Sequence, residues 1–360
     1  MANNCTPKVQ VKLTEIFKGS PYRSNTGALD FAFSSANGSA VQARMIEKNG
    51  MNSVYAITRR ASTCTAIVDC SSIACTDSGT NQSLTSCDTF DTFSCASSQW
   101  HNLTIDNLRD IGSMEVTDIL AGAVMDQMGK IKDTVDVALV TAINAAAGWV
   151  NTTSNYKKLK LIDDTTKAPV WGVDTNIKLD FQDAGFGEQM PIMLGNRTVA
   201  LYKDAVNRSS YNQLGLNNGA IDTMNAFYDI NINSTNSAPN EVGNDVLFAI
   251  LPQVANLVTW SANTGVFASR NQFSSTDINA LKMVNTDNST YSFSTLMDPR
   301  TGMLFDFDIV FDPKCKKWQW RIYTYYKVLV NPLTGCKDSN FNGIVKYDVC
   351  PLSDVFCLNP

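Results

Sequence analysis

Apolar residues recur three and four positions apart along one long stretch in the middle of the chain. Between positions 116 and 147 they fall at Ile119, Ala123, Val124, Met128, Ile131, Val135, Leu139, Ala142, Ile143 and Ala146. This spacing places them on one face of an α-helix. A helix of that span, closed by Gly148, is about 45 Å long at 1.5 Å per residue, roughly three times the mean length. It is either a long core helix or a spine on which separate lobes are mounted.

A strict alternation of apolar and polar residues marks the region 305–330. In FDFDIVF (305–311), Phe305, Phe307, Ile309 and Phe311 face one side, and Asp306 and Asp308 face the other. After the turn DPKCKK, the segment WQWRIYTYYKVLV (318–330) continues the apolar face with Trp318, Trp320, Ile322, Tyr326 and Val328. The pattern predicts a long antiparallel hairpin. Arg321 and Lys327 fall on its polar side, where we expect them to pair with Asp306 and Asp308 for about a few tenths of a kcal/mol each.

The remaining segments have weaker patterns. Residues 1–40 contain turn signals and little periodic apolarity, so we expect an extended arm that does not bury itself. The stretch RMIEKNGMNSVYAITRR (44–60), with a turn signal at Asn49 and Gly50, predicts a hairpin. Between 151 and 299, short strand-like pieces alternate with helical ones, including an expected helix Thr198–Asn207, which indicates an α+β lobe.

Composition restricts the class of protein. Of the 360 residues, 44% are hydrophobic and 18% are charged, which predicts a globular protein of two or three subdomains. A net charge of −5 argues against a protein that neutralises many phosphates of a nucleic acid. The amino terminus lacks the apolar region of a signal peptide, and no apolar run reaches the roughly 18 residues that span a bilayer. We therefore expect a soluble protein made in the cytosol.

Half of the ten cysteines lie in one polar segment, CTAIVDCSSIACTDSGTNQSLTSCDTFDTFSC, at Cys64, Cys70, Cys75, Cys87 and Cys95. A zinc site needs closely spaced ligands such as C-x2-C, and the chain has no such spacing and a single histidine. Disulfides within or between subunits and free thiols both remain open. Disulfides are rare in the reducing cytosol, so a protein assembled inside a cell and later released would reconcile its origin with this cysteine content.

Other candidate motifs do not predict chemistry. His101 is the only histidine, which removes most Ser-His-Asp and Cys-His arrangements and indicates a structural role. Gly129 and Lys130 lie in the middle of the predicted helix, where a phosphate-binding loop does not fit. Asp338, Asn340, Asn342 and Gly343 follow the start of a calcium loop, but Lys346 and Val349 stand at its ninth and twelfth positions, so we expect a turn instead. No catalytic residue, metal or cofactor is predicted, and we expect no enzymatic activity.

The order of these elements resembles a known family. Three segments resemble parts of its fold: GEQMPIMLGNRTVALYKDAV (187–206), DVLFAILPQVANL (245–257) and MLFDFDIVFDPKCKKWQWRIYTYYKVLV (303–330). With the arm, the loop and the long helix, they make residues 40–350 similar to the major capsid protein of tailed bacteriophages, which has the Hong Kong 97-like fold. The Cys-rich insertion at 64–95 departs from the family pattern, and no scaffolding segment precedes the arm.

The resemblance implies an α+β fold with a fixed division of the chain. It would make residues 1–42 an amino-terminal arm, 43–104 an extended loop with the Cys-rich insertion, and 105–150 the spine helix of the peripheral domain. Residues 151–300 would be mainly the axial domain, and 301–360 would return to the peripheral domain through the hairpin and the C-terminal segment. The five cysteines would then lie on a bridge between subunits, where disulfides formed after release could lock a shell.

The implied function is a structural one. The chain would self-assemble, in the host cytoplasm, into the icosahedral shell of a virion around a double-stranded DNA genome. Its partners would be copies of itself in hexamers and pentamers, separate scaffolding, portal and decoration proteins, and packaged DNA bound without sequence specificity, with no membrane. Two alternatives remain: the shell protein of an encapsulating nanocompartment, and a Cys-rich extracellular adhesin or binding module. An enzyme ranks third.

Overall fold

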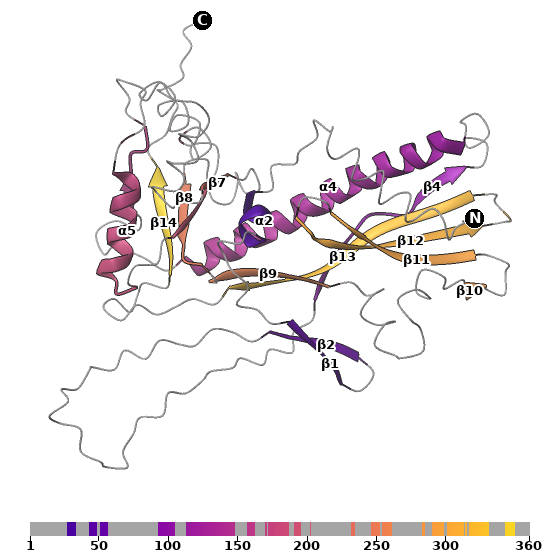
Figure 1. Ribbon diagram of the computed structural model, residues 1–360, viewed down its shortest axis with the longest axis horizontal. Helices are drawn as coiled ribbons and strands as arrows, with labels where there is room; N and C mark the ends of the chain where they lie inside the picture. Colours follow the sequence, from indigo (N-terminus) through magenta and orange to yellow (C-terminus); the bar gives the residue numbers. More distant parts are fainter. Residues whose placement is uncertain are drawn as a thin grey trace, which may run out of the picture.

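The structure is a computed structural model (Figure 1). It describes residues 27–33, 43–48, 51–56, 93–104, 113–147, 157–162, 170, 172–186, 191–195, 202, 232–234, 246–252, 254–260, 283–284, 290–298, 301–312, 314, 317–330 and 343–349. These residues form helices and three β-sheets, so the predicted α+β fold class is confirmed.

The largest sheet has seven strands arranged around one long strand, β13 (Lys317–Val330). The predicted hairpin of 305–330 is confirmed, because β13 pairs antiparallel with β12 (Leu304–Asp312). The other strands of the sheet are β3 (Ser94–Ser97), β4 (His101–Thr104), β9 (Ala255–Trp260), β10 (Met283–Val284) and β11 (Thr290–Met297). β12 and β9 follow one another along one edge of β13, and β4 and β3 along the other.

A second sheet of five strands lies beside the carboxyl end of the long helix (Figure 1). Its strand order is β5 (Lys157–Leu159), β14 (Ile344–Val349), β8 (Val246–Ile250), β6 (Ile192–Gly195) and β7 (Ile232–Ser234). Every residue of β6 and β8 is buried. Helix α5 (Val173–Asp183) contributes Ile177 and Phe181 to the core of this sheet.

Helix α4 (Ser113–Ala146) joins two hydrophobic cores. Its residues from Leu120 to Val135 pack with the seven-stranded sheet in what we call the first core. Leu139, Val140 and Ile143 pack with the five-stranded sheet in the second core. Of the two interpretations left open by the sequence, the spine with separate lobes is the one observed. The helix begins three residues before the predicted start, and Gly148 lies outside the described residues.

The expectation that residues 1–40 are extended throughout is wrong. Residues Gly27–Ala32 form helix α2, in which Ala28, Leu29 and Phe31 are fully buried. Six residues make fewer than two turns, too few to show helical periodicity in the sequence. Packing against α4 and both sheets, rather than local pattern, therefore holds this helix in place.

The predicted hairpin near residues 44–60 is confirmed as strands β1 (Ala43–Lys48) and β2 (Met51–Ala56). The register pairs Lys48 with Met51, which leaves a connection at Asn49 and Gly50. These strands pair only with each other and with no strand of the two larger sheets among the described residues. Figure 1 shows them below the seven-stranded sheet, on the side away from α4.

Two predictions made from residue ranges depend on segments that are only partly described. In the expected helix Thr198–Asn207, Tyr202 is described, as a buried helical residue, and the other residues lie outside the described part. The predicted domain ranges stay predictions. The last two ranges each contribute strands to both large sheets: β14, from the range 301–360, pairs with β8 and β5 of the five-stranded sheet, and β9 and β11, from the range 151–300, belong to the seven-stranded sheet.

A buried ion pair connects α4 to the turn between β11 and β12. The Lys132 Nζ atom lies 3.2 Å from Asp298 Oδ1, and both side chains are buried. The other carboxylate oxygen, Oδ2, accepts hydrogen bonds from the Thr301 backbone N–H at 3.0 Å and from the Thr301 hydroxyl at 2.6 Å. The turn itself requires glycine at Gly302, which has a φ of 74°.

Substituting Lys132→Met should lower the free energy of unfolding by about 3–5 kcal/mol, because it leaves the Asp298 carboxylate buried without its cation. Urea unfolding followed by tryptophan fluorescence measures this change. The matched control is Lys130→Met, which removes an exposed ion pair with Asp126 on the same helix and should cost less than about 0.5 kcal/mol. Adding Asp298→Asn to Lys132→Met should restore part of the loss. Equal effects of the two lysine substitutions would contradict this role of the buried pair.

Candidate functional site

Of the five cysteines singled out from the sequence, the structure describes Cys95. It lies in β3 with an exposed, free thiol, and its backbone pairs with Tyr325 of β13. Cys64, Cys70, Cys75 and Cys87 lie outside the described residues. Whether these thiols pair with one another or across subunits stays a prediction.

Cys95 belongs to the face of the seven-stranded sheet that points away from α4, which we call the outer face. Side chains alternate along a strand, and the neighbouring Ala96 packs in the first core, so Cys95 points the opposite way. Burial raises the pKa of the Cys95 thiol above its ordinary value; the Arg321 guanidinium lowers this pKa, and the Asp306 carboxylate raises it. Because the thiolate is the reactive form, burial is the main cause that lowers the reactivity of Cys95, and the two charges modify it in opposite directions.

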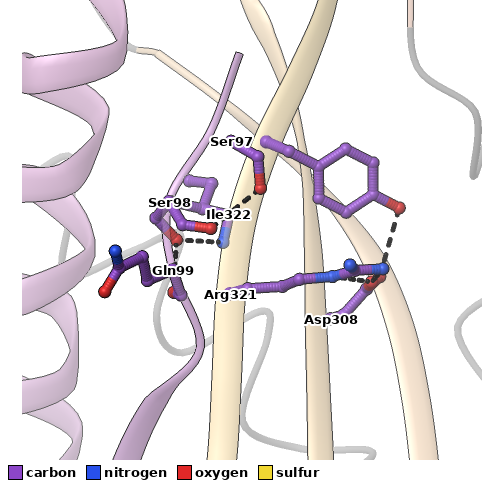
Figure 2. A network of polar contacts seen from close by, with 7 residues as sticks. Ser97, Ser98, Gln99, Asp308, Arg321 and Ile322 are labelled. Carbon is purple, nitrogen blue, oxygen red and sulfur yellow. Dashed lines mark hydrogen bonds and ion pairs between the residues drawn. The ribbon is translucent and has the colours of Figure 1, made fainter. Parts of the chain in front are cut away.

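The outer face contains a buried carboxylate at its centre. Asp308 is 0% exposed; its Oδ2 atom accepts a hydrogen bond from Arg321 Nε at 2.8 Å and lies 2.7 Å from Arg321 Nη2 in an ion pair. The Tyr323 hydroxyl donates to the other oxygen, Oδ1, at 3.4 Å. Figure 2 shows Arg321 extended across the sheet toward Asp308. The pair of Arg321 and Asp308 expected from the sequence is therefore confirmed.

Two details of that expectation are wrong. Asp306 and Asp308 are both buried on the polar side of the hairpin, so the expected contribution of a few tenths of a kcal/mol does not apply to the pair of Arg321 and Asp308. Lys327 does not pair with either carboxylate across β12, because the register places Asp306 opposite Tyr323 and Lys327 opposite Val258 of β9. Alternation identifies the face of a strand but not what covers that face.

The Arg321 guanidinium lies close to two aromatic rings. Its Cζ atom is 4.7 Å from the centroid of the Trp100 ring and 4.9 Å from that of Tyr323. Burial, followed by the charges of Asp308 and Asp306, raises the pKa of Tyr323, so its hydroxyl remains protonated and can donate. Trp100 is 42% exposed although it stacks on the guanidinium. Each contact is a cation–π interaction, which adds to the ion pair with Asp308 in holding the guanidinium.

Ser98 fixes the chain just before Trp100. Its backbone N–H donates to Ile322 O at 2.8 Å, and its hydroxyl accepts from the Ile322 N–H at 3.1 Å and donates to Gln99 O at 3.0 Å. Figure 2 shows these contacts between the end of β3 and β13. The side chain thus continues the strand pairing beyond β3 and orients the residues that lead to Trp100.

His101 is the first residue of β4 and packs on a neighbouring strand of the same sheet. Its ring stacks on Trp320 with centroids 4.7 Å apart, and its buried Nε2 atom has no hydrogen-bond partner among the described residues. These are the contacts of a packing residue, as the sequence indicated. Within the described part of the chain, no group of three or more potential metal ligands comes together.

The segment that resembled a calcium loop enters a strand. Residues 344–349, at its seventh to twelfth positions, form β14, and the Lys346 ammonium donates to Asn144 Oδ1 of α4 at 3.0 Å. Gly343 has a φ of 81°, which fits a turn just before the strand. Asp338, Asn340 and Asn342 lie outside the described residues. The expected turn is thus described only at Gly343, and the rest of that prediction lies outside the described residues.

Exposed apolar side chains occur on both lobes. Trp100 and Met297 lie on the lobe of the seven-stranded sheet, and Leu179 lies on α5 of the other lobe. Met297 points to the outer face, because its neighbour Leu296 packs in the first core. No helix that the structure describes has both the length and the apolarity needed to cross a membrane.

Comparisons with known proteins found similarity at the level of structure only. No protein-family profile matches the chain, and no curated protein sequence matches it. A structure described as Mycobacterium phage Adephagia is 12% identical, with a TM-score of 0.42 over 93% of each chain. A phage-related protein from Bordetella bronchiseptica is 8% identical, with a TM-score of 0.39 over 95% of this chain and 96% of the other.

A further solved structure is described as the capsid asymmetric unit of cyanophage A-1(L). It is 10% identical, with a TM-score of 0.41 over 72% of this chain and 76% of the other. The solved structures to which this chain is similar thus include phage proteins, one of them described as a capsid. Because the identities and TM-scores are this low, we base no functional inference on them.

The reactivity of Cys95 should change in opposite directions when its two charged neighbours are altered. In the unaltered protein, alkylation of Cys95 by iodoacetamide, followed by peptide mass spectrometry, should reach half its maximal rate above the ordinary pKa of a thiol. Arg321→Met should raise this midpoint because it removes a nearby cation, and Asp306→Asn should lower it because it removes a nearby anion.

Lys130→Met is the control, because it removes a cation from the exposed side of α4, away from the outer face. It should leave the midpoint unchanged. If the Arg321 and Asp306 substitutions moved the midpoint in the same direction, general loosening of the sheet would explain the result and the electrostatic account would be wrong.

Proposed function

We propose that this chain is a structural protein, the major capsid protein of a tailed bacteriophage, which self-assembles into an icosahedral shell around a double-stranded DNA genome. The observation that supports this most directly is the separate hairpin of β1 and β2. Within the described part of the chain, these strands form a two-stranded sheet that pairs with neither of the two larger sheets.

The stability of a two-stranded sheet explains why the hairpin points to assembly. An isolated hairpin is at best marginally stable in water, and it needs a further surface to become fixed. Such a surface can be supplied by another copy of the chain. Many identical contacts of this kind, repeated by symmetry, close a shell although each contact is weak.

The shape and surface of the body fit the same role. Helix α4 packs in the cores of both lobes, so the two lobes are joined by one continuous helix. Trp100 and Met297 on one lobe and Leu179 on the other supply exposed apolar groups for contacts with neighbours on different sides. Aromatic and arginine side chains are the types that most often anchor protein interfaces.

In this proposal the chain follows the Hong Kong 97-like architecture. The seven-stranded sheet with α4 corresponds to the peripheral domain, the five-stranded sheet with α5 to the axial domain, and the β1–β2 hairpin to the extended loop. Copies of the chain associate as hexamers and pentamers in the host cytoplasm, with separate scaffolding, portal and decoration proteins. The packaged DNA contacts the inner face without sequence specificity; with a net charge of −5 on the chain, this requires an inner face that is less acidic than the rest of the surface.

The cysteines of 64–95 have a proposed role in this assembly. Cys95 has an exposed, free thiol. After release from the reducing cytosol, dissolved oxygen could oxidise such thiols on neighbouring subunits to disulfides. We expect purified particles to contain disulfide-linked species on non-reducing gels that collapse to the monomer on reduction. Particles that run only as monomer without reductant would rule out the intersubunit disulfides while leaving the capsid proposal in place.

Replacing residues 43–56 by a Gly/Ser segment of the same length should abolish assembly and leave the body folded, because the hairpin belongs to neither large sheet. Sedimentation velocity and light scattering should show large particles for the unaltered chain and only small species for the variant. The midpoint of thermal unfolding serves as the internal control and should stay the same. A variant that still forms the same particles would contradict the proposed role of the hairpin.

A further inference from the structure

Helix α2 lies where the two lobes meet. Figure 1 shows it against α4, between the strands of the two sheets. Its apolar side chains are divided between the two cores: Ala28 and Phe31 pack in the second core, and Leu29 packs in the first. It contacts β6 and β7 of one sheet and β9 of the other. Among the described helices, only α2 and α4 contribute to both cores.

One buried hydrogen bond fixes α2 to α4 at the boundary between the cores. The Leu29 backbone N–H donates to Asp136 Oδ1 at 2.9 Å. Along α4, Val135 is the last residue in the first core, and Leu139 is the first in the second core. Asp136 therefore lies at the transition, and its carboxylate is 0% exposed. A buried carboxylate requires hydrogen-bond donors, and α2 supplies one of them.

The two sheets have no strand pairing with each other among the described residues. Their relative orientation depends on side-chain packing along α4 and on α2, and also on Ala255 of β9 and Val328 and Val330 of β13, which pack with the second core. Of these elements, α2 is separate in sequence from both sheets. It is a distinct piece of chain that lies between the two lobes (Figure 1).

We propose that α2 is a wedge that fixes the angle between the two lobes, and that the hydrogen bond from Leu29 to Asp136 holds the wedge in place. Without this bond the lobes adopt further orientations while each keeps its own fold. In a shell, the same angle would determine how neighbouring copies meet. That consequence rests on the proposed function, whereas the wedge itself is a property of the single chain and is tested on it.

The distance between the lobes can be measured by pulsed electron paramagnetic resonance. Spin labels are attached through a genetically encoded ketone amino acid at Leu179 of α5 and Met297 of β11, both exposed, because the ten cysteines prevent thiol labelling. Labelled protein is diluted with unlabelled protein so that only distances within one chain contribute. The unaltered chain should give one narrow distribution.

Asp136→Leu removes the acceptor at similar size and should broaden this distribution or add a second distance. The ratio of alternative to native orientation should rise by about 5- to 150-fold, as expected when a buried donor loses its partner. Asp136→Asn retains an acceptor oxygen and should keep the narrow distribution. Lys346→Met is the matched control: it breaks a contact between α4 and β14 within one lobe and should also leave the distribution unchanged.

Phe31→Ala is a second test of the wedge, because it weakens the packing of α2 and leaves Asp136 intact. Hydrogen exchange of β8 and β12 reports whether each lobe stays folded. A broadened distribution with both sheets still protected supports the wedge. Unchanged distances in both Asp136→Leu and Phe31→Ala would overturn the wedge. Loss of protection in both sheets would also overturn it, because that result would make α2 an ordinary part of a single core. Equal broadening in Asp136→Asn would overturn the role of the hydrogen bond.

Discussion

The burial of one helix by two successive cores is the contact on which the rest of this fold depends. Helix α4 packs first on the seven-stranded sheet and then on the five-stranded one, so a single helix is part of both cores. Each fully buried aliphatic side chain contributes about 1.5–3 kcal/mol, and α4 supplies such residues to both cores. Because α4 is long enough to pack in both cores, it connects the two lobes.

Buried charge ties the other elements to this helix and its sheet. Lys132 on α4 pairs with Asp298 in the turn between β11 and β12, and Asp136 on the same helix accepts the Leu29 N–H of α2. On the outer face, Arg321 pairs with Asp308 beneath Trp100. Such pairs contribute little net stability when complete but are costly to break, so they define one arrangement of neighbouring elements. They suit a subunit that must present the same surfaces in every copy.

Elements with long, regular patterns could be predicted from the sequence, and elements held by packing could not. The period of α4 and the alternation in β12 and β13 identified both elements, and Arg321 was matched correctly with Asp308. Helix α2 was missed because six residues are too few for a period. The burial of Asp306 and Asp308 and the position of Trp100 were missed because they depend on residues far apart in the chain. The pairing of the cysteines stays a prediction, because four of the five lie outside the described residues.

The central claim is that the chain builds a closed shell from copies of itself. Negative-stain electron microscopy of the protein, expressed alone and together with the products of its neighbouring genes, tests this most directly. We predict closed shells, or rings of five or six subunits. A monodisperse monomer under every condition would contradict the claim and would favour the extracellular binding module instead.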